Sequence, residues 1–246
     1  MERLKNKRFS LSDRKNPLVY AFWSTVNKLL IKFRFQRFEV IGKQNIPVTG
    51  PFLLVSNHCS RWDGLIVYHT IGRPSNFMVS PNELKGNQGA VLVSMGAFPA
   101  NPRFDLIGHA LSMFNKGQGV VVFPEGNTFY DGNTHNFKTG AAKIAFAAAQ
   151  SGYDIPILPA AIHYSEDGKV ARIAIGEPIN ATESCDNGAV SPKSLRTFSD
   201  RLHREVCFLR SGLGSLGDKL AVLSSTGNRD WSALISSQST AQNFTA

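Results

Sequence analysis

Short apolar runs alternate along the chain with longer segments in which apolar residues return every three or four positions. The short runs are typical of buried strands, and the longer repeats are typical of amphipathic helices. Strands that alternate with helices predict an α/β fold. The predicted strands lie at 38–42, 52–56, 77–79, 120–123, 155–163 and 170–175, and the predicted helices at 17–35, 61–70, 105–115, 140–150 and 195–209, with 91–98 partly helical.

A turn at 166–168 joins the last two predicted strands as a hairpin, which makes the sheet mixed. We therefore expect a single α/β domain at 37–210, with a mixed, mostly parallel sheet flanked by helices. An N-terminal amphipathic helical segment, 1–36, precedes it. Residues 211–246 are rich in Ser, Gly, Thr, Asn and Gln, with apolar anchors only at 220–223 and 231–235. This composition predicts a polar tail that is mobile or loosely docked.

Positive charge is concentrated in residues 1–43, which hold 11 Lys and Arg against 3 Asp and Glu and leave 16 against 15 for the remainder. The nearly neutral remainder argues against a nucleic-acid surface, whereas the basic segment favours an anionic surface or partner. Lys28 and Lys32 interrupt helix 17–35, so it is too charged for a membrane span. With Trp23 and several Phe, this helix either lies on a membrane surface or packs on the domain with its lysines in water.

Cysteine usage and the start of the chain bear on the compartment. Cys59, Cys185 and Cys207 are an odd number and lack metal-ligand spacing. They indicate reduced thiols in the cytosol, not a disulfide framework. The basic first residues are not followed by an apolar stretch of the kind found in a cleaved signal, so none is expected.

His58 comes directly after the predicted strand 52–56, and Asp63 follows it by five positions. Side chains at the exit of a strand lie where α/β folds bind ligands. In the first turn of the next helix, Asp63 could hold one imidazole nitrogen and leave the other as a base for a hydroxyl nucleophile. The alternative is a loop histidine followed by an aspartate that only complements the helix dipole.

A second polar loop, Glu125-Gly126-Asn127-Thr128, follows the predicted strand 120–123. Its glycine allows backbone N–H groups to approach an anion, although an ordinary turn has the same composition. Arg103 is a candidate for binding phosphate because a guanidinium can bind two phosphate oxygens. Lys138 could add charge, although lysines at helix starts are usually solvated.

Other chemistries lack their patterns. The chain has no Gly-x-Ser-x-Gly elbow, no Walker loop and no Gly-x-Gly-x-x-Gly. Cys59 is next to His58 in sequence, but neighbours on a turn rarely point at each other, so a thiol nucleophile is not expected. No His, Cys and Asp cluster has metal spacing.

Four blocks together resemble the glycerolipid acyltransferases that include 1-acylglycerol-3-phosphate O-acyltransferase. Asn57-His58-x4-Asp63 is similar to the family's His-x4-Asp motif, and 96–103 to its second block, with a displaced arginine. Phe123-Pro124-Glu125-Gly126 is similar to its Phe-Pro-Glu-Gly-Thr-Arg block, and 157–161 to its proline-centred block. The sequences at 138–142 and 176–179 also resemble those of the family. The resemblance covers residues 35–180 and makes 37–210 an acyltransferase domain.

The resemblance implies transfer of an acyl group from acyl-coenzyme A or acyl carrier protein to a lysophospholipid hydroxyl in phospholipid biosynthesis. Asp63 would orient His58 as the base, with no bound cofactor and no acyl-enzyme. Arg103, Glu125, Gly126, Asn127, Thr128 and Lys138 would form the acceptor site. The resemblance also implies a peripheral or monotopic enzyme at the cytoplasmic face of a membrane with anionic lipid. This favours the interpretation that the N-terminal helix lies on the membrane surface.

One departure concerns the acceptor. The family usually has Thr-Arg after Glu-Gly, where this chain has Asn127-Thr128. The missing arginine is thought to meet the acceptor's phosphate, so either Arg103 or Lys138 compensates or the acceptor is a different lysolipid. Two other functions remain open: a lipid ester or thioester hydrolase that uses the same His-Asp pair, and a non-catalytic membrane lipid-binding protein.

Overall fold

A computed structural model describes residues 8–181 and 190–226, with side chains up to residue 215. Seven strands form one sheet in the order β1-β7-β6-β2-β5-β3-β4, in which only β6 and β7 pair antiparallel. The predicted mixed, mostly parallel sheet is thus confirmed. The strands are β1 (Arg37–Ile41), β2 (Phe52–Ser56), β3 (Ser75–Val79), β4 (Ala97–Pro99), β5 (Gly119–Val122), β6 (Ile157–Tyr164) and β7 (Val170–Ile175).

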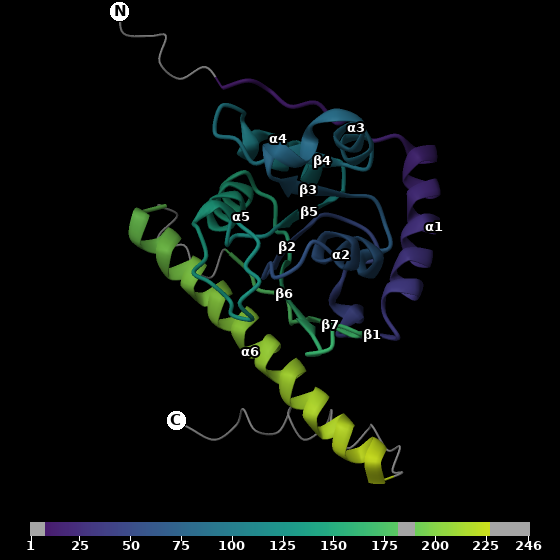
Figure 1. Cartoon of the computed structure of the whole chain (residues 1–246). Coiled ribbons are helices and arrows are strands. Elements are labelled where there is room, and N and C mark those ends of the chain that lie inside the picture. Colours follow the sequence, from purple (N-terminus) through teal and green to yellow (C-terminus); the bar gives the residue numbers. More distant parts are fainter. Residues whose placement is uncertain (1–7, 182–189, 227–246) are drawn as a thin grey trace, which may run out of the picture.

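Helices cover both faces of the sheet (Figure 1). One apolar cluster joins α1 and α2 to one face of the central strands, and a larger cluster joins α4, α5 and α6 to the other. Strands β2 and β5 are buried along their whole length, as expected for parallel strands covered on both faces. The helices are α1 (Pro17–Arg34), α2 (Asp63–Ile71), α3 (Gly86–Ser94), α4 (Leu106–Asn115), α5 (Gly140–Gln150) and α6 (Pro192–Thr226), with 3-10 turns at Lys43–Asn45 and Pro81–Leu84.

Helix α1 packs on the domain with one face. Its Ile31 is buried in the cluster that contains α2, and the buried Asn27 side chain donates to the Leu65 carbonyl of α2 at 2.9 Å. The Tyr20 carbonyl accepts from the Tyr68 hydroxyl at 3.0 Å. The core-packing interpretation of this helix is therefore correct for this face. No helix in the described part of the chain has the length and apolar character needed to cross a bilayer.

Two predicted elements differ from the structure. Residues 91–98, predicted as partly helical, divide between the end of α3 and the edge strand β4. The last helix does not end at 209 but runs to Thr226, so the predicted boundary at 210 falls inside α6. Its Ser and Gly residues resemble those of a loop, yet Leu213 is buried against the sheet and extends the packed face. Residues 227–246 and Cys185 lie outside the described residues.

Candidate active site

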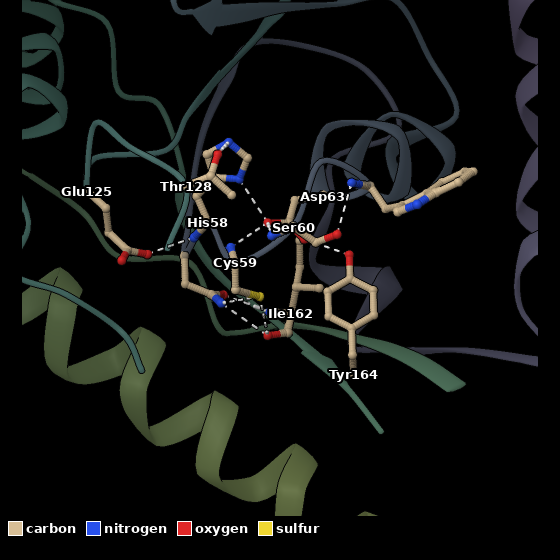
Figure 2. A network of polar contacts seen from close by, with 10 residues as sticks. His58, Cys59, Ser60, Asp63, Glu125, Thr128, Ile162 and Tyr164 are labelled. Atoms are coloured by element: carbon tan, nitrogen blue, oxygen red, sulfur yellow. Dashed lines mark hydrogen bonds and ion pairs between the residues drawn. The ribbon is translucent and has the colours of Figure 1, made fainter. Parts of the chain in front are cut away.

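The candidate site lies at the carboxyl edge of the sheet, where β5, β2 and β6 are neighbours. Figure 2 shows the network of polar contacts around His58 and Asp63 at this edge. His58 follows the end of β2, the loop with Glu125 and Thr128 follows β5, and Tyr164 is the last residue of β6. Because these three strands are parallel, their ends meet at one edge. This is the position at which open α/β sheets bind ligands.

Asp63 holds the His58 ring as the sequence predicts. Asp63 is the first residue of α2, and its Oδ2 lies 2.8 Å from His58 Nδ1. The same oxygen accepts the backbone N–H groups of Cys59 at 2.6 Å and Ser60 at 2.8 Å, while Oδ1 accepts the Tyr164 hydroxyl at 2.6 Å. An ionised carboxylate is an acceptor only, so His58 donates from Nδ1 and leaves Nε2 as the basic nitrogen.

The other ring nitrogen of His58 contacts a hydroxyl. Thr128 Oγ1 lies 2.8 Å from His58 Nε2, and because Nδ1 carries the proton, the threonine is the donor. The Phe123 ring stacks on the imidazole with centroids 4.5 Å apart. The His58 side chain retains 24% exposure, whereas Asp63 is fully buried. The base is thus fixed from one side and open to a hydroxyl on the other.

Glu125 joins two loops around His58. Its Oε1 accepts the backbone N–H of His58 at 2.7 Å, and its Oε2 accepts that of His135 at 2.9 Å. Burial raises the pKa of the Glu125 carboxyl, and the N–H groups of His135 and His58 offset part of that rise. Both oxygens therefore serve the backbone, and the predicted contact between Glu125 and an acceptor stays a prediction.

Gly126 and Lys138 are neighbours beside this loop. Gly126 has φ 71°, and a Cβ at this position would collide with the Lys138 ammonium group. The Lys138 backbone donates to the Pro124 carbonyl at 2.9 Å, and its side chain is exposed. Asn127 is also exposed. Of the predicted residues after β5, Glu125 and Thr128 thus contact His58, and Lys138 lies beside Gly126 in the same loop region.

Arg103 lies at a different position on the same edge. It follows β4, which is three strands away from β2, or about 14 Å at the usual spacing of about 4.8 Å between strands. Its side chain is exposed. The structure does not bring Arg103 into contact with His58, Glu125 or Thr128.

A closer arginine was missed in the sequence. Arg210 on α6 donates from Nη1 to Thr134 Oγ1 at 2.9 Å, next to the His135 backbone that binds Glu125. Its positive charge contributes to lowering the pKa of Glu125, against the larger effect of burial. No motif marks Arg210, because only the path of α6 across the sheet brings it to this edge.

Tyr164 was also missed, and Asn57 was named only as part of the His-x4-Asp motif. The Asn57 side chain makes two hydrogen bonds with the backbone of Ile162. Its Nδ2 donates to the Ile162 carbonyl at 3.1 Å, and its Oδ1 accepts from the Ile162 N–H at 2.8 Å. This contact fastens the chain before His58 to β6. Burial, and then the nearby Asp63 charge, raise the pKa of the Tyr164 hydroxyl, which keeps it a donor to Asp63.

Cys59 does not act on His58. Its thiol lies near the Ile162 carbonyl, and burial, followed by the Asp63 charge, raises its pKa to about 12. The thiolate is therefore disfavoured, which agrees with the expectation from sequence. In the described ranges no three His, Cys, Asp or Glu side chains are grouped so that they could hold a metal ion.

Comparisons with known proteins bear on the fold and the family of this chain. A crystal structure of the 1-acyl-sn-glycerophosphate (LPA) acyltransferase PlsC from Thermotoga maritima matches with a TM-score of 0.60 and 22% identity, over 77% of this chain and 79% of that one, and shows the same fold. A curated 1-acyl-sn-glycerol-3-phosphate acyltransferase from Borreliella burgdorferi is 28% identical over 140 residues, or 54% of each protein, so the chain spans about half the length of this relative. The family model described as Acyltransferase matches residues 37–163, and the chain belongs to this acyltransferase family.

Proposed function

We propose that this acyltransferase moves a fatty acyl group from an acyl thioester to the free hydroxyl of a lysophospholipid such as 1-acylglycerol-3-phosphate, in phospholipid biosynthesis. The donor is acyl-coenzyme A or acyl carrier protein. One observation carries the proposal: a hydroxyl, that of Thr128, lies 2.8 Å from His58 Nε2, while Asp63 fixes Nδ1. The base is therefore already arranged to take a proton from an alcohol.

The proposed mechanism is a direct transfer. The lysolipid hydroxyl displaces Thr128 from His58 Nε2 and gives its proton to that nitrogen as its oxygen attacks the thioester carbonyl. Asp63 stabilises the resulting imidazolium. Backbone N–H groups stabilise the oxyanion, the C–S bond breaks, and the thiol leaves with the proton from His58.

Thr128 occupies the position of the family's usual arginine in this chain. The phosphate of the acceptor therefore needs another cation. Lys138 beside Gly126 and Arg210 near Glu125 are suitable, because both lie around the loop that contains Thr128. Arg103 would reach only an acceptor that extends along the sheet edge toward β4. We propose Lys138 and Arg210 as the principal phosphate contacts and Arg103 as a more distant one.

A membrane surface is the proposed location of the reaction, on its cytoplasmic face. The side of α1 opposite its packed face exposes Leu18 at 81%, Phe22 at 62%, Leu29 at 51% and Phe33 at 83%. Spacings of four, seven and four residues align these side chains along one helix stripe. Lys28 and Lys32 are exposed as well. An apolar stripe accompanied by lysines is suited to an anionic membrane surface, so α1 supports both packing and peripheral binding.

The test is an acyl-transfer assay with radiolabelled acyl-coenzyme A or acyl carrier protein and a panel of lysolipids. Transfer to lysophosphatidate that is lost in His58→Ala supports the proposal. Transfer only to another lysolipid would reassign the head group. Release of free fatty acid alone would favour a hydrolase, and lipid binding that does not depend on His58, without any turnover, would favour a non-catalytic binding protein.

A further inference from the structure

Thr128, His58 and Asp63 form a continuous chain of hydroxyl, base and orienting carboxylate, with 2.8 Å at each link. This is the arrangement by which a side-chain hydroxyl is activated as a nucleophile. We propose that Thr128 itself accepts the acyl group and forms a threonine ester when no lysolipid occupies the site. The inference rests on the proposed function for its donor, an acyl thioester.

Thr128 and the lysolipid compete for the same nitrogen. A hydroxyl acceptor must approach His58 Nε2, and Thr128 already occupies that hydrogen-bonding position. The threonine side chain contacts the base and is half-buried, so it remains accessible to a substrate. The acyl thioester bound without an acceptor therefore meets Thr128 as the activated hydroxyl nearest to the base.

Neighbouring nucleophiles do not compete. The pKa of Cys59 is raised by burial to about 12, and its sulfur lies toward the Ile162 carbonyl. Ser60 contacts Asp63 through its backbone, and its hydroxyl accepts the Trp62 N–H at 3.2 Å instead of contacting His58. Only the threonine hydroxyl is hydrogen-bonded to the base within the described residues.

Backbone donors for the oxyanion lie in the same loop. Gly126 adopts φ 71°, and within residues 8–181 and 190–215 the N–H groups of Asn127 and Thr128 donate to no protein acceptor. The N–H of a nucleophilic residue is a common oxyanion donor in acyl transfer. The loop therefore offers a nucleophile and donors for the charge that develops on the carbonyl oxygen.

The chemistry balances without a further reactant. Thr128 Oγ1 gives its proton to His58 Nε2 and bonds to the thioester carbonyl carbon; the C–S bond breaks, and the thiol leaves with that proton. In a second step His58 deprotonates a water, whose oxygen attacks the ester. Thr128 regains its proton, and the product is a free fatty acid.

The experiment mixes the full chain with palmitoyl-coenzyme A without lysolipid, quenches the reaction with acid at times from milliseconds to minutes, and measures intact mass and peptide masses. We expect one palmitoyl group on residue 128 in the wild type and in Thr128→Ser, and none there in Thr128→Val or His58→Ala. Cys59→Ala is the matched control and keeps the adduct, which excludes acyl transfer through the neighbouring thiol. Circular dichroism checks that each variant is folded.

Two readouts make the inference falsifiable. Release of palmitate should fall at least about 100-fold in Thr128→Val, since an activated nucleophile is lost. Absence of an adduct on Thr128 at every quench time, or wild-type palmitate release by Thr128→Val, overturns the inference. Transfer to lysolipid without any adduct would leave the proposed function intact and refute only the threonine ester. An adduct without transfer to any lysolipid would support the threonine ester and refute the proposed function.

Discussion

Tyr164, the last residue of β6, donates its hydroxyl to Oδ1 of Asp63 at 2.6 Å, on the carboxylate oxygen that His58 does not use. The two residues are 101 positions apart in sequence. Strand β6 thereby helps to fix the Asp63 carboxylate that orients His58.

Tyr164→Phe should weaken the site without abolishing it. A hydrogen bond to a charged group contributes about 1.5–3 kcal/mol, and its loss leaves Asp63 with three donors. If about 1.4 kcal/mol of this is lost in the transition state, kcat falls about tenfold. The melting temperature should also drop by several degrees. Unchanged kcat and unchanged thermal unfolding in the variant would show that the contact is dispensable.

His58→Ala should abolish acyl transfer and preserve the fold. General base catalysis typically contributes about 10²–10⁴-fold, and His58 is the base that Asp63 holds. The side chain is partly exposed, so its removal leaves no closed cavity. His69→Ala removes a histidine ring that is in edge-to-face contact with Phe38, away from the site. This variant is the control and should keep its activity. Near-normal turnover by His58→Ala would refute the assignment of the base.

The pattern of apolar runs predicted most of this site because the runs locate strand ends. His58, Glu125 and Thr128 each follow a run that becomes β2 or β5, and parallel strands bring such residues to one edge. The predicted helix at 61–70 puts Asp63 in its first turn, and Asp63 is the first residue of α2. These contacts depend on local chain direction, which sequence patterns predict well.

Contacts that depend on distant packing were not predictable. Tyr164 and Arg210 reach the site through the registry of β6 and the path of α6, and neither has a motif. The bond between Thr128 and His58 was missed because the sequence assigned this residue to the acceptor site. The length of α6 was underestimated because its Ser and Gly residues are poor helix formers that packing of Leu213 overrides.

Glu125 should make stability depend on pH in an identifiable direction. Because burial raises its folded pKa above the ordinary value of 4.5, the folded state binds the proton more tightly than the unfolded state. The stability that Glu125 contributes is therefore present below pH 4.5 and decreases as pH rises through the folded pKa. Urea unfolding of wild type and Glu125→Gln at several pH values from 4 to 8 should show this decrease only in the wild type. A constant difference between the two proteins across that range would contradict it.

The exposed stripe of α1 should bind anionic vesicles. Phe22→Ser with Phe33→Ser should reduce sedimentation with phosphatidylglycerol vesicles, because burying one such side chain contributes about 1.5–3 kcal/mol. Lys28→Gln with Lys32→Gln should weaken binding mainly at low salt, by about 1 kcal/mol for each charge. Val48→Ser removes an apolar side chain outside α1 that is 90% exposed, and it is the control. These substitutions are preferable to deletion of residues 1–35, which would also remove the buried Ile31 and Phe35. Sedimentation that none of the α1 changes affects would leave this helix with a packing role alone.

Arg210 and Arg103 offer a matched pair for the acceptor's phosphate. Arg210 lies beside the loop of Glu125 and Thr134, whereas Arg103 lies three strands from β2. Arg210→Gln should therefore raise KM for lysophosphatidate about tenfold or more, the effect of losing about 1.4 kcal/mol of binding, with a small change in kcat. With an uncharged monoacylglycerol as acceptor, the same variant should resemble the wild type. Arg103→Gln should have the smaller effect on KM. A larger effect from Arg103 would mean that the phosphate lies along the sheet edge toward β4, and the acceptor would then extend away from α6.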